Sequence, residues 1–179
     1  DLLELSRVGR IVNPAEDAPF ADLVKEALEL VQGQLSARGV EVVVGSDLPT
    51  VRVDRRRMVE VLQNLLENAS KFTVPERPPR IEVGFVKDPG RAFFVRDNGQ
   101  GIDPVYRERI FNIFEKLDPK AEGSGVGLSL VLRIVEAHGG RVWAESPGIG
   151  AGATFFFTLG PECWGEEPSR PAAGRGSSV

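Results

Sequence analysis

One predicted helix combines two residue patterns that together limit what this chain can fold into. Residues 55–72 follow Asp54, a favourable N-cap residue, and place their apolar side chains on one arc of the helix. On a helical wheel Asn68 and Lys71 lie at about +40° and −20° from Asn64, so the three polar residues form one narrow stripe beside that arc. A second layer must cover the apolar arc, and the stripe is placed where it can line a cleft at its edge.

The chemistry of this stripe suits a metal–phosphate complex. Carboxamide oxygens are hard ligands for Mg²⁺, and a lysine ammonium group suits phosphate oxygens. The plainer interpretation is a solvated outer face of an amphipathic helix, and this helix taken alone favours it. Asparagine costs a helix only roughly 0.5 kcal/mol relative to alanine, so two asparagines are a mild oddity.

Size and composition indicate one globular domain. The chain has 179 residues, of which 41% are hydrophobic and 27% charged, which is enough to bury a core. The net charge of −4 argues against nucleic acid as the main partner, because phosphate backbones select basic surfaces. No apolar run reaches the length of a membrane span, and no signal peptide is present.

Two residue types occur only once. Cys163 is the single cysteine, which excludes an internal disulfide and a cysteine metal site and makes a cytoplasmic setting the expected one. His138 is the single histidine, which removes most zinc sites. It precedes Gly139 and Gly140 at a predicted helix end, where a side chain can satisfy terminal carbonyls, so we expect a structural role for it.

The order of predicted elements favours an α+β fold, a two-layer α/β sandwich with helices on one face of a mixed sheet. A hairpin at "KDPG" joins two strands, and a long loop at 99–125 holds one short helical patch at 104–114. The other predicted elements are helices at 20–39 and 126–140 and strands at 40–45, 80–86, 91–97, 141–146 and 153–159.

Composition divides the chain into four segments. Residues 1–10 resemble the last turns of a helix, residues 11–18 form a proline-containing linker, and residues 19–159 form the domain. Residues 160–179, rich in Pro, Gly, Ser and charge, are expected to be a disordered tail.

An aspartate followed by glycines comes at the end of a predicted strand. In "VRDNGQGIDP" Asp97 ends the strand, and Gly99 and Gly101 allow a flat ligand to approach the backbone closely. A fixed carboxylate there can accept a hydrogen bond from an exocyclic amine such as N6 of adenine. "DNG" is also a strong hairpin signal, but the residues after it do not alternate as a returning strand would.

A second glycine cluster opens a predicted helix. Gly123, Gly125 and Gly127 lie where free backbone N–H groups and the helix dipole can bind phosphate. No strand leads directly into the cluster and no Gly-Lys pair occurs, so it is neither a Rossmann fingerprint nor a P-loop. Phe111 and Phe114 lie between the two clusters, in a loop whose length is typical of a lid.

Five segments, in order, resemble the sequence boxes of sensor histidine kinase catalytic domains, which share the Bergerat-type ATP-binding fold with gyrase, mismatch-repair and chaperone ATPases. The segments are "NLLENASKF", "DNGQGID", "FNIFEKL", "GSGVGLSLV" and "GATFFFTL". The resemblance covers roughly residues 19–159 and implies a flexible lid over ATP and Mg²⁺.

The resemblance also implies a role for individual residues. Asn68 would be the Mg²⁺ ligand, Asn64 and Lys71 the catalytic residues on the phosphate side, and Asp97 the acceptor for the adenine amine. Thr154 would support Asp97 and the adenine. The remaining residues implied in nucleotide binding are Gly99, Gly101, Ile102, Phe114, Gly123, Ser124, Gly125, Val126, Gly127 and Leu128.

Asn64 stands where hydrolytic relatives of this family carry the glutamate that activates water. A carboxamide cannot act as a general base near neutral pH, which favours phosphate transfer over hydrolysis. Glu67 lies about 60° around the helix from Asn64 and is a poor candidate for that base. The alternatives are an ATPase switch or anti-sigma-type serine kinase of the same fold, and a nucleotide-free interaction module.

The resemblance places the phosphorylated histidine outside this chain. His138 matches a structural "HGG" of the family, whereas the acceptor histidine lies on an upstream dimerisation helix whose last turns residues 1–10 resemble. The expected partners are therefore the protein's own dimerisation and phosphoacceptor domain and a response regulator receiver domain. The full-length protein is expected to be a homodimer, cytoplasmic or anchored to a membrane.

Overall fold

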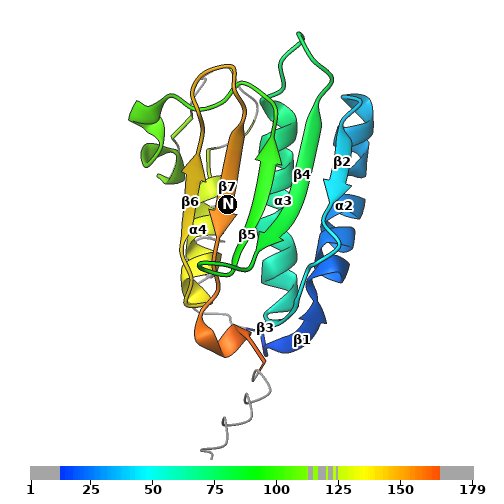
Figure 1. Ribbon diagram of the computed structural model, residues 1–179, viewed down its shortest axis with the longest axis vertical. Coiled ribbons are helices and arrows are strands. Elements are labelled where there is room, and N and C mark those ends of the chain that lie inside the picture. The colour runs from blue at the N-terminus through cyan, green and yellow to red at the C-terminus, as the bar shows by residue number, and fades with distance from the viewer. Residues whose placement is uncertain (1–12, 113–114, 117–119, 121–122, 124, 166–179) are drawn as a thin grey trace, which may run out of the picture.

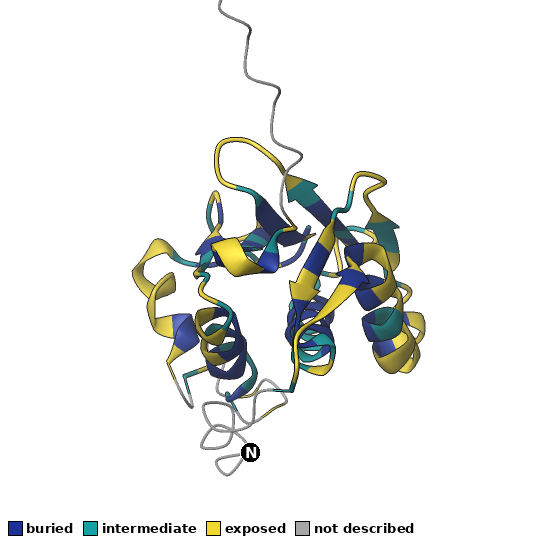
Figure 2. Cartoon of the chain, turned by 90° about the horizontal axis from the view of Figure 1, so that it is seen from below, coloured by how far each residue is buried: buried dark blue, intermediate teal, exposed yellow. Residues whose placement is uncertain are grey.

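Two layers make up the protein in its computed structural model, which describes residues 13–112, 115–116, 120, 123 and 125–165. A five-stranded sheet forms one layer, and the helices α2 (Phe20–Ala37), α3 (Arg55–Lys71) and α4 (Gly127–Ala137) all pack against one face of it (Figure 1). The buried sides of the helices and of the sheet face one another between the layers (Figure 2). The predicted α+β two-layer sandwich is confirmed.

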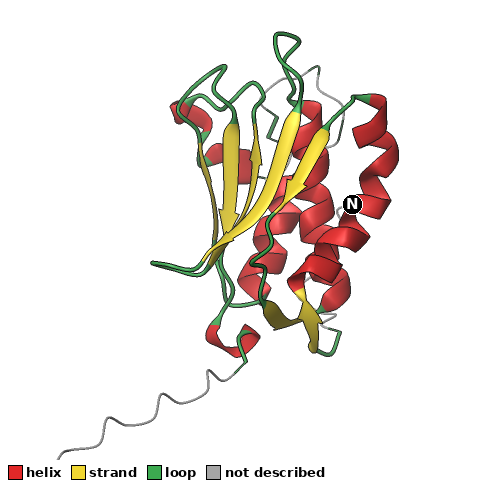
Figure 3. Cartoon of the chain, turned by 45° about the vertical axis from the view of Figure 1, so that its right-hand side comes forward, coloured by secondary structure: helices red, strands yellow, loops and turns green. Residues whose placement is uncertain are grey.

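The main sheet is mixed, with the strand order β2-β4-β5-β7-β6. Its one parallel pair is β2 (Glu41–Val44) with β4 (Arg80–Val86), and the others are antiparallel: β4 with β5 (Ala92–Asp97), β5 with β7 (Ala153–Phe157), and β7 with β6 (Val142–Glu145). Figure 3 shows the three helices standing behind this sheet. The predicted hairpin at "KDPG" is the β4–β5 connection.

A second, two-stranded sheet was not predicted. β1 (Glu16–Pro19) pairs antiparallel with β3 (Thr50–Val53) and closes one end of the molecule. Each strand has four residues, too few to establish a period-two pattern, and β1 ends in a proline. The part of the expected linker from Glu16 onward is therefore strand.

α3 takes the form that its sequence predicts. The Asp54 side chain accepts a hydrogen bond of 3.2 Å from the Arg57 N–H and so caps the helix. The helix ends before Phe72, and its apolar arc is buried between α2, α4 and the sheet. The buried residues of that arc are Met58, Val59, Leu62, Leu65, Leu66 and Ala69.

The expected disordered tail is wrong for its first residues. Residues 160–165 fold back onto the core through the 3-10 turn η3 (Pro161–Cys163), and Cys163 is only 2% exposed. The Trp164 ring lies parallel to that of Phe93, with centroids 5.9 Å apart. The surrounding Pro, Gly and Glu residues give this segment a composition typical of disorder, so the packing of these two apolar residues was not predicted. Residues 166–179, like the expected helix end at 1–10, lie outside the described residues.

The helical patch expected at 104–114 is two short 3-10 turns, η1 (Pro104–Tyr106) and η2 (Arg109–Phe111). Asp103 caps the first turn by accepting a hydrogen bond of 3.0 Å from the Val105 N–H. Ile110 and Phe111 are buried, and the Phe111 ring meets that of Phe155 edge-on at 6.2 Å. These contacts anchor the start of the expected lid to the sheet.

Candidate functional site

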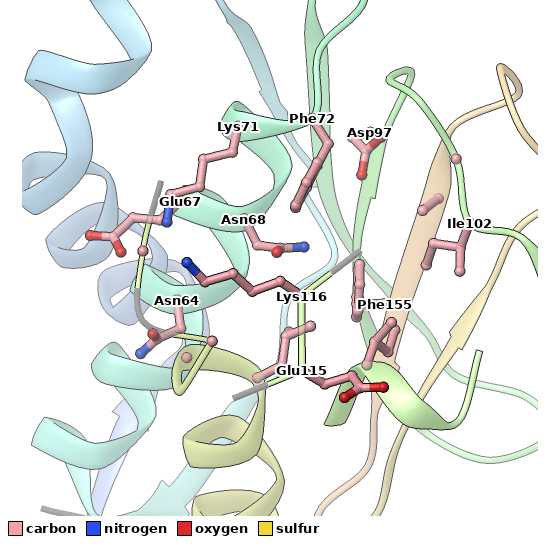
Figure 4. Close-up of a pocket in the computed structure, with 17 residues that line it drawn as sticks. Asn64, Glu67, Asn68, Lys71, Phe72, Asp97, Ile102, Glu115, Lys116 and Phe155 are labelled. Atoms are coloured by element: carbon pink, nitrogen blue, oxygen red, sulfur yellow. The ribbon is translucent and has the colours of Figure 1, made fainter. Parts of the chain in front are cut away.

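A cleft of about 270 Å³ opens between α3, the N-terminus of α4 and the ends of β5 and β7. Figure 4 shows Asn64 and Asn68 of α3 on one side and Asp97, Ile102 and Phe155 on the other. The residues that line it are Asn64, Glu67, Asn68, Lys71, Phe72, Asp97, Gly101, Ile102, Ile110, Glu115, Lys116, Gly123, Gly125, Gly127, Leu128, Ala153 and Phe155.

The polar stripe of α3 faces this cleft, as predicted. Asn64, Asn68 and Lys71 are each half-buried and line it together. The Asn64 amide nitrogen donates a hydrogen bond of 2.8 Å to the Glu60 carbonyl, which leaves its oxygen facing the start of α4. A Cβ atom at Gly127 would lie 2.8 Å from that oxygen, so the absence of a side chain lets α4 approach α3 here.

Asp97 is the buried carboxylate of the site. It ends β5, is 9% exposed, and accepts a hydrogen bond of 2.9 Å from the Gly99 N–H at Oδ1. Burial raises the pKa of Asp97 to about 6, although the backbone N–H groups of Gly99 and Ala153 and the charge of Arg77 oppose the rise. Near neutral pH Asp97 is therefore an ionised, oriented acceptor at an apolar wall.

The floor beside Asp97 depends on close backbone packing. The Gln100 N–H donates a hydrogen bond of 2.8 Å to the Phe72 carbonyl, and a Cβ atom at Gly99 would lie 1.9 Å from the same oxygen. Gly99 supports the floor from behind, whereas Gly101 and Ile102 line the cleft themselves. The segment can approach Phe72 only because residue 99 has no side chain.

The second glycine cluster lies at the opposite end of the cleft. Gly123, Gly125 and Gly127 line it together with Leu128, and a Cβ atom at Gly123 would lie 3.0 Å from the Lys71 Nζ atom. Val126 is buried just before α4 and does not line the cleft. Two other residues expected to bind nucleotide, Phe114 and Ser124, lie outside the described residues.

The expected role of Thr154 is wrong. Thr154 pairs with Arg96, whose Nε atom donates a hydrogen bond of 3.2 Å to the Thr154 hydroxyl on the sheet face away from the helices. Its neighbour Ala153 pairs with Asp97 and lines the cleft. Side chains alternate between the two faces of a strand, so the two positions cannot exchange roles.

Several residues of the site were not predicted. Phe72, Ile110 and Phe155 supply apolar walls, and Glu115 and Lys116 reach the cleft from the segment after η2. Phe155 is two residues after Ala153, so strand alternation would have identified it once the register with Asp97 was known. Glu67 lies at the rim, where it accepts a hydrogen bond of 3.1 Å from the Gln63 amide.

His138 lies away from the cleft, at the C-terminus of α4. Its Nε2 atom accepts a hydrogen bond of 3.1 Å from the Asp54 N–H, so Nδ1 carries the proton and donates to the Ile134 carbonyl at 2.8 Å. The Nε2 bond joins α4 to the N-cap of α3, and the Nδ1 bond holds the ring against its own helix, which matches the structural role expected for this residue.

Comparison with known proteins identifies the family. The family model of the histidine kinase-, DNA gyrase B- and HSP90-like ATPases matches residues 53–162. The chain belongs to this family. Within the family, its fold is that of the histidine kinase catalytic ATP-binding domains.

Individual members of this ATPase family support the assignment. The chain is 50% identical to the methanogenesis regulatory histidine kinase FilI of Methanothrix harundinacea over 160 residues, which is 89% of this chain and 18% of FilI. Among solved structures, full-length ShkA in complex with AMPPNP has a TM-score of 0.74 and 32% identity over 90% of this chain and 34% of ShkA. Histidine kinase ThkA in complex with response regulator protein TrrA has a TM-score of 0.65 and 25% identity over 81% and 41% of the two chains.

Two features are absent from the described residues. None of their helices is both long and apolar enough to cross a bilayer. Nor do their His, Cys, Asp and Glu side chains form a group of three or more that could hold a metal ion.

Proposed function

We propose that this chain is the catalytic domain of a sensor histidine kinase, which binds Mg-ATP and transfers the γ-phosphate to a histidine on a dimerisation domain outside the chain. One arrangement carries the proposal: Asn68 from the helix layer and Asp97 from the sheet line the same cleft. The buried carboxylate fits the adenine end of ATP, and the amide stripe at the other end of the cleft fits the phosphate end.

At the purine end, Asp97 accepts a hydrogen bond from the adenine N6 amine. Guanine carries a carbonyl at that position, which would meet the ionised carboxylate acceptor to acceptor, so the site selects adenine. The apolar side chains of Phe72, Ile102 and Phe155 give the base a non-polar surface on which to lie.

At the phosphate end, the Lys71 ammonium group and the backbone N–H groups at the start of α4 bind phosphate oxygens. The donor set fits Mg²⁺, since Asn68 offers a neutral amide oxygen and the phosphates supply charged oxygens. A bound Mg²⁺ would neutralise phosphate charge and orient the chain of phosphates. Asn64 cannot take a proton from water, so its place beside the phosphates favours transfer to a histidine over hydrolysis.

The proposed partners follow from this activity. The phosphoacceptor is the protein's own dimerisation domain, and the next acceptor is a response regulator receiver domain, a class of protein that ThkA binds. The chain spans 18% of FilI and 34% of ShkA, so the rest of the kinase lies outside it. The full-length protein is then a homodimer whose kinase domain is cytoplasmic, whether or not it is anchored to a membrane.

Titration with a fluorescent ATP analogue, with and without Mg²⁺, tests the proposal. We expect saturable binding that Mg²⁺ strengthens and that unlabelled ATP, but not GTP, displaces. Asp97→Asn should remove this binding, and Asp47→Asn, at an exposed loop position outside the cleft, is the matched control. Equal displacement by GTP and ATP, or unchanged binding by Asp97→Asn, would count against the proposed function.

A further inference from the structure

Arg77 lies outside the cleft but contacts the backbone on which Asp97 depends. It belongs to the connection between α3 and β4, and its side chain is half-buried. Its Nη2 atom donates a hydrogen bond of 3.0 Å to the Gly99 carbonyl, and its guanidinium also donates to the carbonyls of Asn98 and Gly150. One side chain therefore joins the segment after β5 to the β6–β7 turn.

The contact with Asn98 continues to the carboxylate of Asp97. The Asn98 carbonyl that accepts from Arg77 and the Gly99 N–H that donates to Asp97 belong to one peptide unit. A cation on the carbonyl polarises that peptide, and polarised peptides donate stronger hydrogen bonds. Arg77 thus acts on Asp97 through the peptide and, across space, through its charge.

The second carbonyl contact fixes the other strand of the site. The Gly99 carbonyl accepts hydrogen bonds from Arg77 and, at 3.1 Å, from the Gly152 N–H. Gly152 directly precedes Ala153, which lines the cleft. In addition, the Gly150 N–H donates to the Gln100 carbonyl. Removal of the guanidinium would leave these two segments joined by backbone hydrogen bonds and by the Ser146 hydroxyl, which accepts a hydrogen bond of 3.0 Å from the Ile102 N–H.

The other charged groups near Asp97 lie elsewhere in the cleft or on the opposite face of the sheet. Glu67 and Lys71 line the cleft from α3, and Glu115 and Lys116 line it from the segment after η2. The Arg96 guanidinium lies on the opposite face of the sheet, 3.6 Å from Glu82. The charge of Arg77 lowers the pKa of Asp97, after the larger effects of the backbone N–H groups of Gly99 and Ala153.

We propose that Arg77 is a positioning residue for adenine recognition, which holds the peptide 98–99 and the β6–β7 turn in place and keeps Asp97 an ionised acceptor. The inference deepens the proposed function and rests on it, because adenine is the ligand. An arginine that supported only the β6–β7 turn, through Gly150, would leave the titration of Asp97 unchanged, so the two roles give different results.

Two measurements on the 179-residue chain test this role. The first is the ¹³C NMR titration of the Asp97 carboxyl group without nucleotide, in wild type, Arg77→Gln, Arg77→Lys and the control Arg80→Gln. The Arg80 side chain is about half exposed and lies 3.9 Å from Glu41, so its loss removes a nearby charge without touching the network. The second is the Kd for ADP of the same four proteins between pH 5 and 8.

We expect Arg77→Gln to raise the Asp97 midpoint by about half a pH unit or more and to weaken ADP binding at least about threefold at pH 7.5. Arg77→Lys should keep the midpoint near that of wild type, because the charge remains, but should still weaken ADP binding because an ammonium group cannot contact three carbonyls in a fork. Arg80→Gln should match wild type in both measurements.

An unchanged midpoint in Arg77→Gln would overturn the inference, even if ADP binding weakened, because support of the β6–β7 turn alone predicts that result. An equal shift in Arg80→Gln would also overturn it. Should wild type fail to bind ADP, the proposed function would fail, while the NMR titration, which needs no nucleotide, would still decide whether Arg77 acts on Asp97. If Arg77→Gln does not fold, Arg77→Lys keeps the test: a Lys variant with wild-type ADP affinity would overturn the inference.

Discussion

The Asp54 N–H donates a hydrogen bond to His138 Nε2 at 3.1 Å, which ties the N-cap of α3 to the last turn of α4. Asp54 is 3% exposed, so its N–H has little access to water if the imidazole is removed. The two helices whose facing ends form the phosphate side of the cleft are therefore joined at their other ends by the single histidine of the chain.

His138→Ala should lower the free energy of unfolding by about 1–3 kcal/mol, because a buried donor loses its partner. Urea denaturation followed by circular dichroism measures this. The Kd for ATP should change less than about twofold, since His138 lies outside the cleft.

Wild-type protein incubated with labelled ATP should carry no acid-labile phosphate, and phosphohistidine on this chain would contradict the structural role of His138.

Asp97→Asn should make the nucleotide-free protein more stable near pH 7.5 while it removes ATP binding. The pKa of Asp97 is raised by burial to about 6, so the folded state holds the proton more tightly than the unfolded state. Its contribution to stability is fully present below pH ~4 and is lost as pH rises through about 6, at a cost of roughly 3 kcal/mol at most. Asparagine is neutral and avoids that cost.

The check is urea denaturation of both proteins at several pH values from 4 to 8. The stability difference should grow as pH rises from about 4 to about 6 and stay constant above that range. A difference independent of pH would mean that Asp97 does not titrate as its burial requires.

Gly127→Ala should weaken ATP binding by about tenfold, because its Cβ atom would meet the Asn64 oxygen at 2.8 Å and turn that side chain within the cleft. Gly33→Ala is the matched control, since Gly33 lies in α2 with nothing within 4 Å of an added Cβ atom. The control should leave ATP binding unchanged and stabilise the protein by about 0.5–1 kcal/mol. Isothermal titration and thermal melting measure the two effects, and equal ATP affinity in both variants would refute the contact.

Ala153→Leu should weaken ATP binding at least about tenfold, because the larger side chain fills the cleft beside Asp97. Thr154→Leu changes the next residue, which faces away, and should leave the Kd within about twofold of wild type. The same fluorescent titration compares the two variants. A strong effect of Thr154→Leu with a weak effect of Ala153→Leu would contradict the strand register of the structure.

Asn64→Glu should raise the rate of ATP hydrolysis, because it restores a carboxylate beside the phosphates that can activate water. Asn64→Gln has a side chain as long as that of glutamate but keeps a carboxamide, so it should not raise the rate of hydrolysis. Phosphate release measures both rates. If the two variants hydrolyse ATP equally slowly, Asn64 does not explain the preference for transfer.

The sequence predicted the site best where one residue pattern carried the information. The stripe of Asn64, Asn68 and Lys71 followed from helical geometry, and Asp97 was identified by its place between a strand and two glycines. Only the family resemblance predicted that these four residues line one cleft, because a local sequence pattern contains no information on the distance between a helix and the end of a strand.

The errors came from relations between distant segments. Thr154 and Ala153 differ only in which face of β7 they occupy, and the pairing of Asp97 with Ala153 decides this. Arg77 lies in a loop whose own sequence gives no sign of contacts with residues 98–99 and 150. The strands β1 and β3 were missed because each becomes a strand only by pairing with the other.

The turn at residues 160–165 determines where this domain can be cut. A chain shortened at Leu159 would lose Trp164, whose ring lies over Phe93 and also contacts Phe85 at 5.9 Å between centroids. Solvent would then reach a cluster of phenylalanines at the end of the sheet, and such a truncated product is prone to aggregate during expression. The structural boundary of this domain therefore lies beyond its last strand, β7, and after Trp164.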